Sequence, residues 1–228
     1  MMHQSIDKKK YLFYLSILLL LSTINSQSLI NLKLFKIKDI EILEDKSNIN
    51  NSVKEIIEDN LTIFKNQNIF LLDKKQIVKK ISDNNWISNF SIQKKYPSKL
   101  IVKLKKTKPI AKIIVDNENL YVGSNFKLIR SKTQFNNLPN IFGKPKIDEF
   151  KNLMSYLNLS SLSYTDISDI YYLKSGRWNL KIQNNVIIKL PSDNILESLN
   201  LVKKILDNKN IISKNTIDLT VKNQIIVD

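Results

Sequence analysis

Residues 86–111 read WISNFSIQKKYPSKLIVKLKKTKPIA, and this stretch decides how the first half of the chain folds. A Tyr-Pro pair separates two runs that mix apolar residues with lysines, residues 86–95 and 99–106. Pro97 fixes φ at a value that suits a turn. In the second run, the apolar residues that would share one face of a strand are Leu100, Val102 and Leu104. The stretch therefore predicts two consecutive strands joined by a turn, opened by a structural Trp86.

The residues before this stretch add one strand and two helices. The string FKIKDIEIL, residues 35–43, alternates apolar and polar residues around a one-residue phase slip, which predicts a bulged strand. Two later segments carry apolar residues at helical spacing, and Asp73 stands at the N-cap of the second. Their predicted buried stripes are Val53, Ile56 and Ile57 in one helix and Ile77, Val78 and Ile81 in the other. The element order is thus β-α-α-β-β, a small sheet with two helices on one face.

The composition excludes several classes of site. The chain has 228 residues and a formal net charge of +15, supplied almost wholly by lysine, since Arg130 and Arg177 are the only arginines. Proteins that read nucleic acids favour arginine for its planar bidentate fork, so no nucleic-acid partner is expected. The chain has no cysteine, its one histidine is His3, and its three glycines are isolated. Thiolate chemistry, a histidine-based triad or metal site beyond the N-terminal tail, and a glycine-rich phosphate loop are therefore excluded.

The N-terminal segment is built for a membrane. Lys8–Lys10 precede an apolar run, YLFYLSILLLLSTI, at residues 11–24. This run is short for a membrane span, which needs about 20 residues, and extension to Ile30 supplies the length. The segment also fits a cleaved signal peptide, in which Ser26 and Ser28 would be the small residues before the cut. In either case we expect the rest of the chain to lie outside the cytoplasm, because long C-terminal domains cross the membrane largely regardless of charge.

The second half contains a hairpin whose register can be derived from the sequence. Residues 175–191 read SGRWNLKIQNNVIIKLP. A two-residue turn at Asn184 and Asn185 would set some apolar residues against polar ones, whereas a three-residue loop, residues 183–185, places every apolar side chain on one face. The pairs predicted for that loop are Trp178 with Leu190, Leu180 with Ile188, and Ile182 with Val186. This loop needs a left-handed residue at its end, and Asn185 tolerates that conformation.

Two helices and a terminal strand complete the second half. Helical spacing predicts one helix whose buried face consists of Ile147, Phe150, Leu153, Met154 and Leu157. A last helix is predicted over residues 193–207. The alternation after it predicts a single strand over residues 217–227. Because no element follows this strand to cover it, one of its edges is expected to be open.

The order and spacing of these motifs resemble the FtsQ/DivIB family of bacterial cell-division proteins. The residues that carry the resemblance are Trp86-Ile87, Phe90, Ile92, Tyr96-Pro97, Leu100, Val102, Pro109-Ile110-Ala111 and the Arg-Trp…Leu-Pro hairpin ending at Pro191. Two places depart from the family pattern. Lys106 and Thr107 stand where an acidic-basic pair is usual, and Thr220 stands where an arginine is usual.

The resemblance implies an α+β fold with a single N-terminal transmembrane helix, a POTRA domain of order β-α-α-β-β and a C-terminal mixed β domain with flanking helices. The implied boundaries are a cytoplasmic tail at residues 1–10, the transmembrane helix at 11–30, the POTRA domain at 34–105 and the β domain at 106–228. The resemblance also favours a retained anchor over a cleaved signal peptide.

The function implied by the resemblance is that of a non-enzymatic bitopic scaffold of the divisome. Such a protein links other membrane-anchored division proteins, notably FtsB and FtsL, at the septum and helps control septal peptidoglycan synthesis. It is a single-pass protein of the bacterial inner membrane, with its N-terminus in the cytoplasm and most of its chain in the periplasm. No catalytic residue, cofactor, metal or small-molecule substrate is expected.

By the same resemblance, the partner adds a strand to the open edge of the C-terminal domain. The residues expected to bind it are Thr220, Val221, Lys222, Gln224, Ile225 and Ile226. Backbone groups would supply affinity, side chains would supply selectivity, and the lysine would meet an acidic residue of the partner. The alternative at this edge is an ordinary final strand that is solvated on its free side.

Two other functions stay open on the sequence alone. A POTRA-bearing transport or assembly factor would bind extended client chains at a strand edge. A cell-wall hydrolase would need two carboxylates, and its single candidates are Asp148, Glu149, Asp166, Asp169 and Asp193. The partner's identity and affinity, the oligomeric state, and whether the lysine excess contacts lipid or cell wall also stay open.

Overall fold

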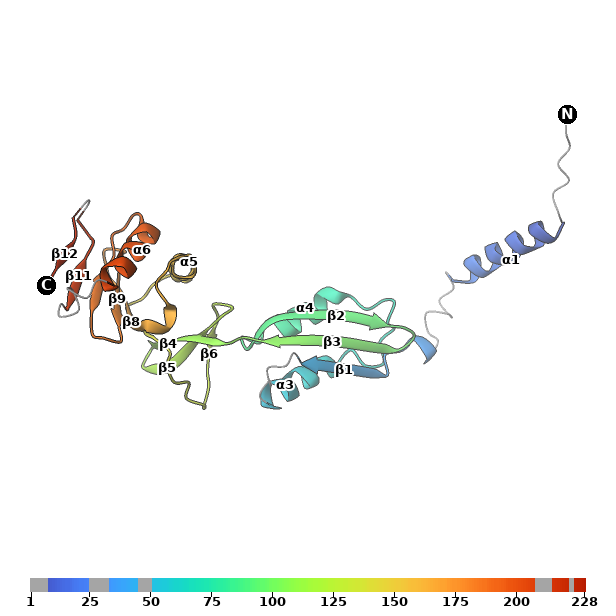
Figure 1. Ribbon diagram of the computed structural model, residues 1–228. Coiled ribbons are helices and arrows are strands. Elements are labelled where there is room, and N and C mark those ends of the chain that lie inside the picture. Colours follow the sequence, from blue (N-terminus) through green and yellow to red (C-terminus); the bar gives the residue numbers. More distant parts are fainter. Residues whose placement is uncertain (1–7, 25–32, 45–50, 208–214, 222–223) are drawn as a thin grey trace, which may run out of the picture. The chain divides into compact units, whose positions relative to one another are not determined.

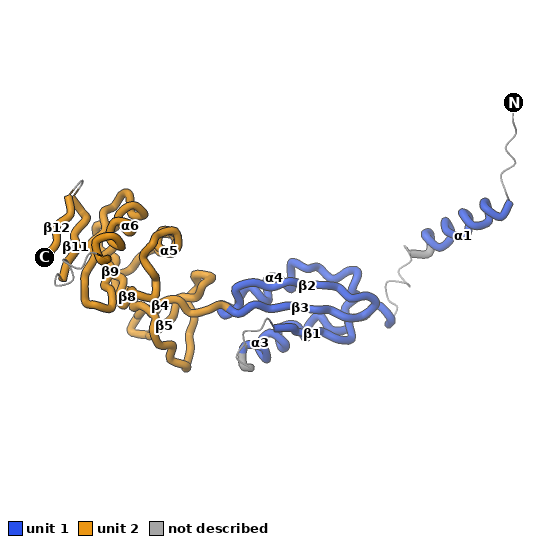
Figure 2. Tube along the Cα trace, viewed as in Figure 1, with its two compact units in different colours: residues 1–106 blue, residues 107–228 orange. Residues whose placement is uncertain are grey.

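The computed structural model describes residues 8–24, 33–44, 51–207, 215–221 and 224–228 (Figure 1). The chain divides into two compact units, Met1–Lys106 and Thr107–Asp228 (Figure 2). Each unit has a hydrophobic core of its own. The two cores show that each unit is stabilised mainly by burial of its own apolar side chains.

The N-terminal helix α1 runs from Lys8 to Ile24 and has 17 residues. Apolar side chains surround it on every side, and those from Tyr11 to Leu15 are each at least 48% exposed. Among the described residues, no helix combines the length and the apolar character that a membrane crossing requires. Of the predicted transmembrane segment 11–30, the structure describes the part up to Ile24, and residues 25–30 lie outside the described residues.

The rest of the first unit has the predicted order β-α-α-β-β. Its elements are η1 (Lys33–Phe35), β1 (Asp39–Glu44), α3 (Asn51–Thr62), α4 (Lys74–Ser82), β2 (Ile87–Lys95) and β3 (Lys99–Lys106). The central strand β3 is parallel to β1 and antiparallel to β2. The two strands predicted from the opening stretch are confirmed, and a cis peptide bond joins Tyr96 to Pro97 in the turn between them.

The predicted first strand is wrong in its first half. Phe35 lies in the short 3-10 helix, and β1 begins only at Asp39. Between them, Ile37 donates its N–H to the carbonyl of Gln67 and accepts from the N–H of Asn66, both at 2.9 Å. The backbone before the phase slip is therefore paired with the loop after α3, and only the backbone after it joins β3.

The two helices bury one face each against the sheet. Their buried residues are Val53, Ile57 and Leu61 in α3 and Ile77 and Ile81 in α4. Two predicted stripe residues are wrong, because Ile56 and Val78 are 52% and 41% exposed. Each is adjacent in sequence to a buried isoleucine, and adjacent helical residues point about 100° apart, so only one of the two can face the core. The N-cap is confirmed, since the Asp73 carboxylate accepts the N–H of Lys75 at 2.9 Å.

The second unit is built on one mixed sheet of nine strands in the order β12-β11-β10-β9-β8-β7-β4-β5-β6. Its elements are β4 (Pro109–Val115), β5 (Glu118–Gly123), β6 (Leu128–Ile129), β7 (Asn140–Phe142), α5 (Ile147–Leu159), η2 (Tyr164–Asp166), β8 (Ile167–Tyr172), β9 (Trp178–Ile182), β10 (Ile187–Lys189), α6 (Ile195–Leu206), β11 (Thr216–Asp218) and β12 (Ile226–Val227). The pairs β4–β7, β7–β8 and β10–β11 are parallel, and the others are antiparallel. The predicted mixed sheet with flanking helices is thus confirmed.

One row of apolar side chains crosses five strands of this sheet. The residues in register from β7 to β11 are Ile141, Ile170, Leu180, Ile188 and Ile217, each at most 5% exposed. Helices α5 and α6 contribute the other side of this core, through residues such as Phe150, Leu153, Leu199 and Val202. Ile147, expected in the buried stripe of α5, is 43% exposed, because it is the first residue of that helix.

The predicted hairpin register is confirmed. Leu180 lies opposite Ile188, and Leu190 donates its N–H to the carbonyl of Trp178 at 2.9 Å. Asn185 ends the three-residue loop with φ at 63°, in the left-handed region. The inward alternation and the turn residue therefore select the same pairing.

Candidate partner-binding site

The predicted single strand over residues 217–227 is wrong, because the chain turns back on itself within that range. β11 ends at Asp218, and β12 returns antiparallel to it. The Asp218 carboxylate accepts the N–H of Thr220 at 2.9 Å and its hydroxyl at 2.6 Å, an Asx-type turn that ends the strand. We call β11 and β12 with their connection, residues 216–227, the C-terminal hairpin.

Asp218 also ties the hairpin to the rest of the sheet. Its second oxygen lies 3.2 Å from the Lys189 ammonium on β10. Burial alone would raise the pKa of Asp218, but the hydrogen bonds from Thr220 and Lys189 outweigh burial and hold this pKa below its ordinary value. The carboxylate is thus ionised at neutral pH and fixes the geometry of the turn.

The free edge of the sheet is formed by β12. Thr216 and Asp228 exchange both backbone hydrogen bonds, at 2.9 and 3.1 Å. Bonded and non-bonded pairs alternate in an antiparallel ladder, so the next pair, Ile217 with Val227, is a non-bonded pair. The N–H and C=O of Val227 therefore point away from β11. In the described part of the chain, no strand lies on that side of β12.

A groove of about 510 Å³ lies where β12 begins, since Gln224 and Ile225 line it. One wall is the connection of the C-terminal hairpin, and the other is the start of α6 with the residues before it. Four predicted binding residues line the groove, namely Thr220, Val221, Gln224 and Ile225. Ile226 lies instead in β12, and Lys222 lies outside the described residues. Val221, Ile225 and Ile226 are 44–46% exposed, so apolar surface is open to a partner.

The opposite wall carries negative charge. Asp193 and Glu197 line the groove there, together with the half-exposed apolar side chain of Leu201. No basic side chain lines the groove among the described residues. The described lining of the groove thus carries two carboxylates and no basic side chain.

Sequence reasoning missed Val227 and the α6 wall of this site. The outward direction of Val227 follows only from its pairing with β11, which a local pattern does not reveal. A signal for the end of β11 was present, however. The Asp-Leu-Thr string at residues 218–220 places an aspartate two residues before a backbone N–H that it can accept, which is typical of a turn.

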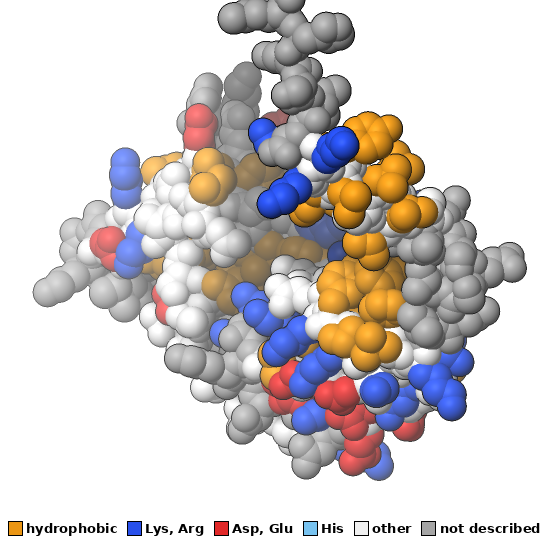
Figure 3. All heavy atoms as spheres, turned by 90° about the vertical axis from the view of Figure 1, so that its right-hand side faces the viewer, with side chains coloured by type: hydrophobic (Ala, Val, Ile, Leu, Met, Phe, Trp, Pro, Cys, Tyr) orange, Lys and Arg blue, Asp and Glu red, His pale blue; other side chains and the backbone are white. Residues whose placement is uncertain are grey.

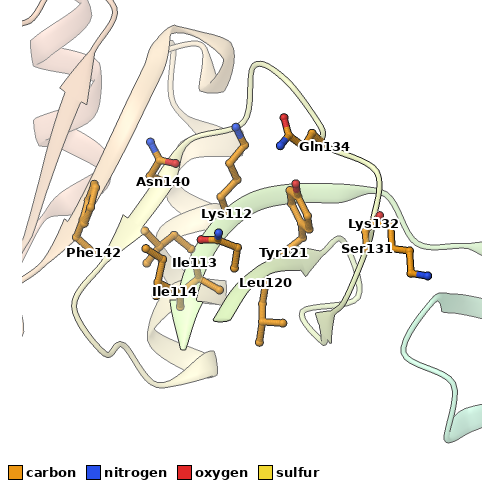
Figure 4. A pocket seen from close by; sticks show the side chains of 12 residues that line it. Lys112, Ile113, Ile114, Leu120, Tyr121, Ser131, Lys132, Gln134, Asn140 and Phe142 are labelled. Carbon is orange, nitrogen blue, oxygen red and sulfur yellow. The ribbon is translucent and has the colours of Figure 1, made fainter. Parts of the chain in front are cut away.

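A larger hollow of about 600 Å³ lies elsewhere on the same sheet, over β4, β5 and β7 (Figure 4). Figure 4 shows Lys112, Asn140 and Gln134 around it, with Ile114 and Phe142 at one side. None of the predicted binding residues lines this hollow, and no carboxylate does. It offers no acid-base pair for chemistry.

The five carboxylates considered for a hydrolase lie at the start of α5 (Asp148 and Glu149), in η2 and β8 (Asp166 and Asp169) and before α6 (Asp193). Glu149 accepts the Tyr172 hydroxyl and the N–H of Lys146, both at 2.7 Å, and these bonds lower its pKa. A general acid in a glycosidase needs the opposite shift. Two others are bound to neighbours, Asp148 to Lys151 and Asp169 to Asn140. Asp166 and Asp193 line different grooves.

Comparison with known proteins matches both units to one family. Residues 35–106 match the model of the FtsQ-type POTRA domain, and residues 113–220 match that of the C-terminal part of cell division protein FtsQ/DivIB. The cell division protein DivIB of Clostridium botulinum is 30% identical over 185 residues, which are 74% of this chain and 72% of the relative. The chain belongs to the FtsQ/DivIB family.

Other members of the FtsQ/DivIB family are more distant. The cell division protein FtsQ of Rickettsia bellii is 22% identical over 197 residues, 85% of this chain and 72% of the relative. The cell division protein FtsQ of Cellvibrio japonicus is 26% identical over 150 residues, 64% of this chain and 44% of the relative. The family match of the second unit ends at residue 220, so it does not reach β12.

Proposed function

We propose that this member of the FtsQ/DivIB family is a non-enzymatic bitopic scaffold of the bacterial divisome. It links membrane-anchored division proteins of the FtsB and FtsL type at the septum and so helps control septal peptidoglycan synthesis. Family membership and the names of its relatives, all cell division proteins, support this role. Binding accomplishes the task, and binding requires surfaces rather than reacting groups.

We propose residues 11–30 as its anchor in the inner membrane, with residues 1–10 in the cytoplasm. The basic flank Lys8–Lys10 favours that orientation under the positive-inside rule. The exposed apolar side chains around α1 need an apolar surrounding. The POTRA domain at 34–105 and the β domain at 106–228 then lie in the periplasm.

The observation that carries the binding role is the free edge of β12, a strand that follows directly on the groove-lining residues Gln224 and Ile225. An extended segment of an FtsB-type partner would pair with the outward N–H and C=O of Val227. Strand addition of this kind draws affinity from backbone bonds and selectivity from side-chain pockets. An apolar side chain of the partner would lie against Val221 and Ile225, and a basic one would reach Glu197.

The test compares two variants of the full chain in detergent. Val227→Pro removes one outward N–H and leaves the bonds between β11 and β12, and proline is tolerated where an edge strand faces solvent. Ile114→Ser changes an exposed residue, 63% accessible, in the hollow over β4 and β5. Both variants should melt like the parent chain.

Co-purification with an FtsB-type partner then distinguishes the two surfaces. We expect Val227→Pro to weaken binding about tenfold or more, because a carbonyl of the partner is left unpaired. Ile114→Ser should bind as the parent chain does. Full-strength binding by a folded Val227→Pro variant would place the partner elsewhere.

A further inference from the structure

One end of the three-stranded sheet exposes an apolar patch that the proposed function does not use. We call this end the tip. It consists of three segments, residues 33–38, 68–75 and 94–99. They meet where β2 turns into β3, whereas the chain leaves the sheet toward the second unit at its opposite end, at Lys106 (Figure 1).

Hydrogen bonds hold the three segments together. Ile69 donates its N–H to the carbonyl of Phe35, and Lys38 donates to that of Ser98, both at 2.9 Å. The Lys94 ammonium donates to the carbonyl of Leu72 at 3.0 Å. Each of the three segments of the tip is therefore hydrogen-bonded to at least one of the other two.

Three aromatic rings of the tip are in contact with one another in a row. The rings of Phe35 and Phe70 meet edge to face at 5.1 Å, and those of Phe70 and Tyr96 stack at 4.8 Å. Four large side chains are each more than half exposed, namely Leu34, Phe70, Leu71 and Tyr96, at 54–65%. Exposed large apolar side chains gathered on one end of a small domain are typical of an interaction site.

Lysine is the commonest charged residue in these three segments, which also contain Asp73. The exposed lysines in these segments are Lys33, Lys38, Lys74, Lys75 and Lys95. Within the described part of the chain none of the five makes an ion pair, whereas Lys99 is bound by Asp39 and Glu41 at 3.1 and 2.8 Å. Figure 3 faces this side of the molecule and shows hydrophobic, basic and acidic side chains on it.

The tip is the end of the first unit that follows α1 along the chain. Lys33 follows Ile24, the end of α1, by nine residues. Nine residues span at most about 30 Å in any conformation. The apolar patch thus lies on the end that is tethered to the apolar helix.

We propose that the tip is a membrane-docking surface that takes an anionic lipid bilayer. Leu34, Phe70, Leu71 and Tyr96 enter the interfacial region, where amphipathic aromatic rings are favoured. The five exposed lysines contact anionic headgroups, since lysines near a membrane surface are attracted to anionic lipids. The proposal rests on the anchoring of the chain by residues 11–30, which holds the tip near the bilayer.

The test uses the full chain, which has no cysteine, so single cysteines can be labelled without background. Leu71→Cys carries an environment-sensitive fluorophore at the tip. Ile56→Cys, 52% exposed on α3, is the matched control in the same unit, and Leu18→Cys in α1 reports on the anchor. Each labelled chain is reconstituted into vesicles of phosphatidylcholine, with or without phosphatidylglycerol, and a lipid-borne nitroxide serves as quencher.

We expect the label at residue 71 to shift to the blue and to be quenched several-fold more than the label at residue 56, in the anionic vesicles. High salt, or Lys74→Gln with Lys75→Gln, should reduce that quenching. Equal quenching of the two labels in both vesicle types would overturn the proposal, as would a blue shift without quenching, which indicates protein contact. The label at residue 18 reports separately on membrane insertion of residues 11–30, because insertion exposes it to the quencher in both vesicle types.

Discussion

Two hairpins of the same sheet, β9–β10 and β11–β12, are neighbours and differ in how far their own sequence completes them. In the first, Leu180 and Ile188 face each other and are fully buried. In the second, the Ile226 side chain opposite Asp218 is 44% exposed. The first hairpin is covered by its own core, and the second leaves a strand edge and apolar side chains exposed.

Loop length accounts for part of the difference. Residues 183–186 lie between β9 and β10, with Asn185 in the left-handed conformation that the turn requires. Residues 219–225 join the second pair, and a longer loop costs more conformational entropy to close. The longer connection leaves the second hairpin with the larger closure cost.

The largest expected difference comes from the same substitution in the two hairpins. Ile188→Ala should lower the free energy of unfolding by about 2–5 kcal/mol, because it opens a cavity in the core. Ile226→Ala should change it by less than ~0.5 kcal/mol, because that side chain is half exposed. Urea unfolding followed through the fluorescence of buried Trp178 measures both. Equal losses would break the comparison.

A smaller effect is expected at the loop of the first hairpin. Asn185→Val should destabilise the second unit by about 1–2 kcal/mol, because a β-branched residue is strained at φ of 63°. Asn185→Gly is the control, since glycine adopts this conformation without strain. The same urea titration decides, and a valine variant as stable as the glycine variant would show that the turn does not set the register.

The smallest effect concerns acid and the carboxylate that ends β11. The folded pKa of Asp218 is lowered, so its stabilisation is present above its ordinary pKa of about 4 and is lost as pH falls through the lower folded value. Asp218→Asn should therefore be less stable than the parent chain at pH 7. The gap should shrink below about pH 4. A gap that stays constant with pH would mean that the charge of Asp218 does not support the turn.

Local patterns predicted much of the fold because its main elements are specified by nearby residues. The Tyr-Pro turn and the alternation around Leu100 place β2 and β3, and the alternation around Leu180 with Asn185 places β9 and β10. The failure in the first strand involves a distant partner. Ile37 pairs with the loop at Asn66 and Gln67 rather than with a strand, and no local feature of residues 35–38 reveals that.

The candidate site was predicted in part, as far as nearby residues specify it. Four of the six named residues line the groove, because they share one short connection after β11. Val227 was missed, since its outward direction depends on the pairing of Thr216 with Asp228. The acidic wall of Asp193 and Glu197 was missed because it comes from a helix far from the strand in sequence.

Amide hydrogen exchange at the free edge tests the central claim most directly. By the ladder's alternation, the N–H of Val227 points outward, and that of Ile226 points toward β11. Exchange is measured on the full chain with and without the periplasmic segment of an FtsB-type partner. We predict that saturating partner slows exchange at Val227 and leaves exchange at Ile226 little changed. Unchanged exchange at Val227 in a chain saturated with partner would contradict strand addition at β12.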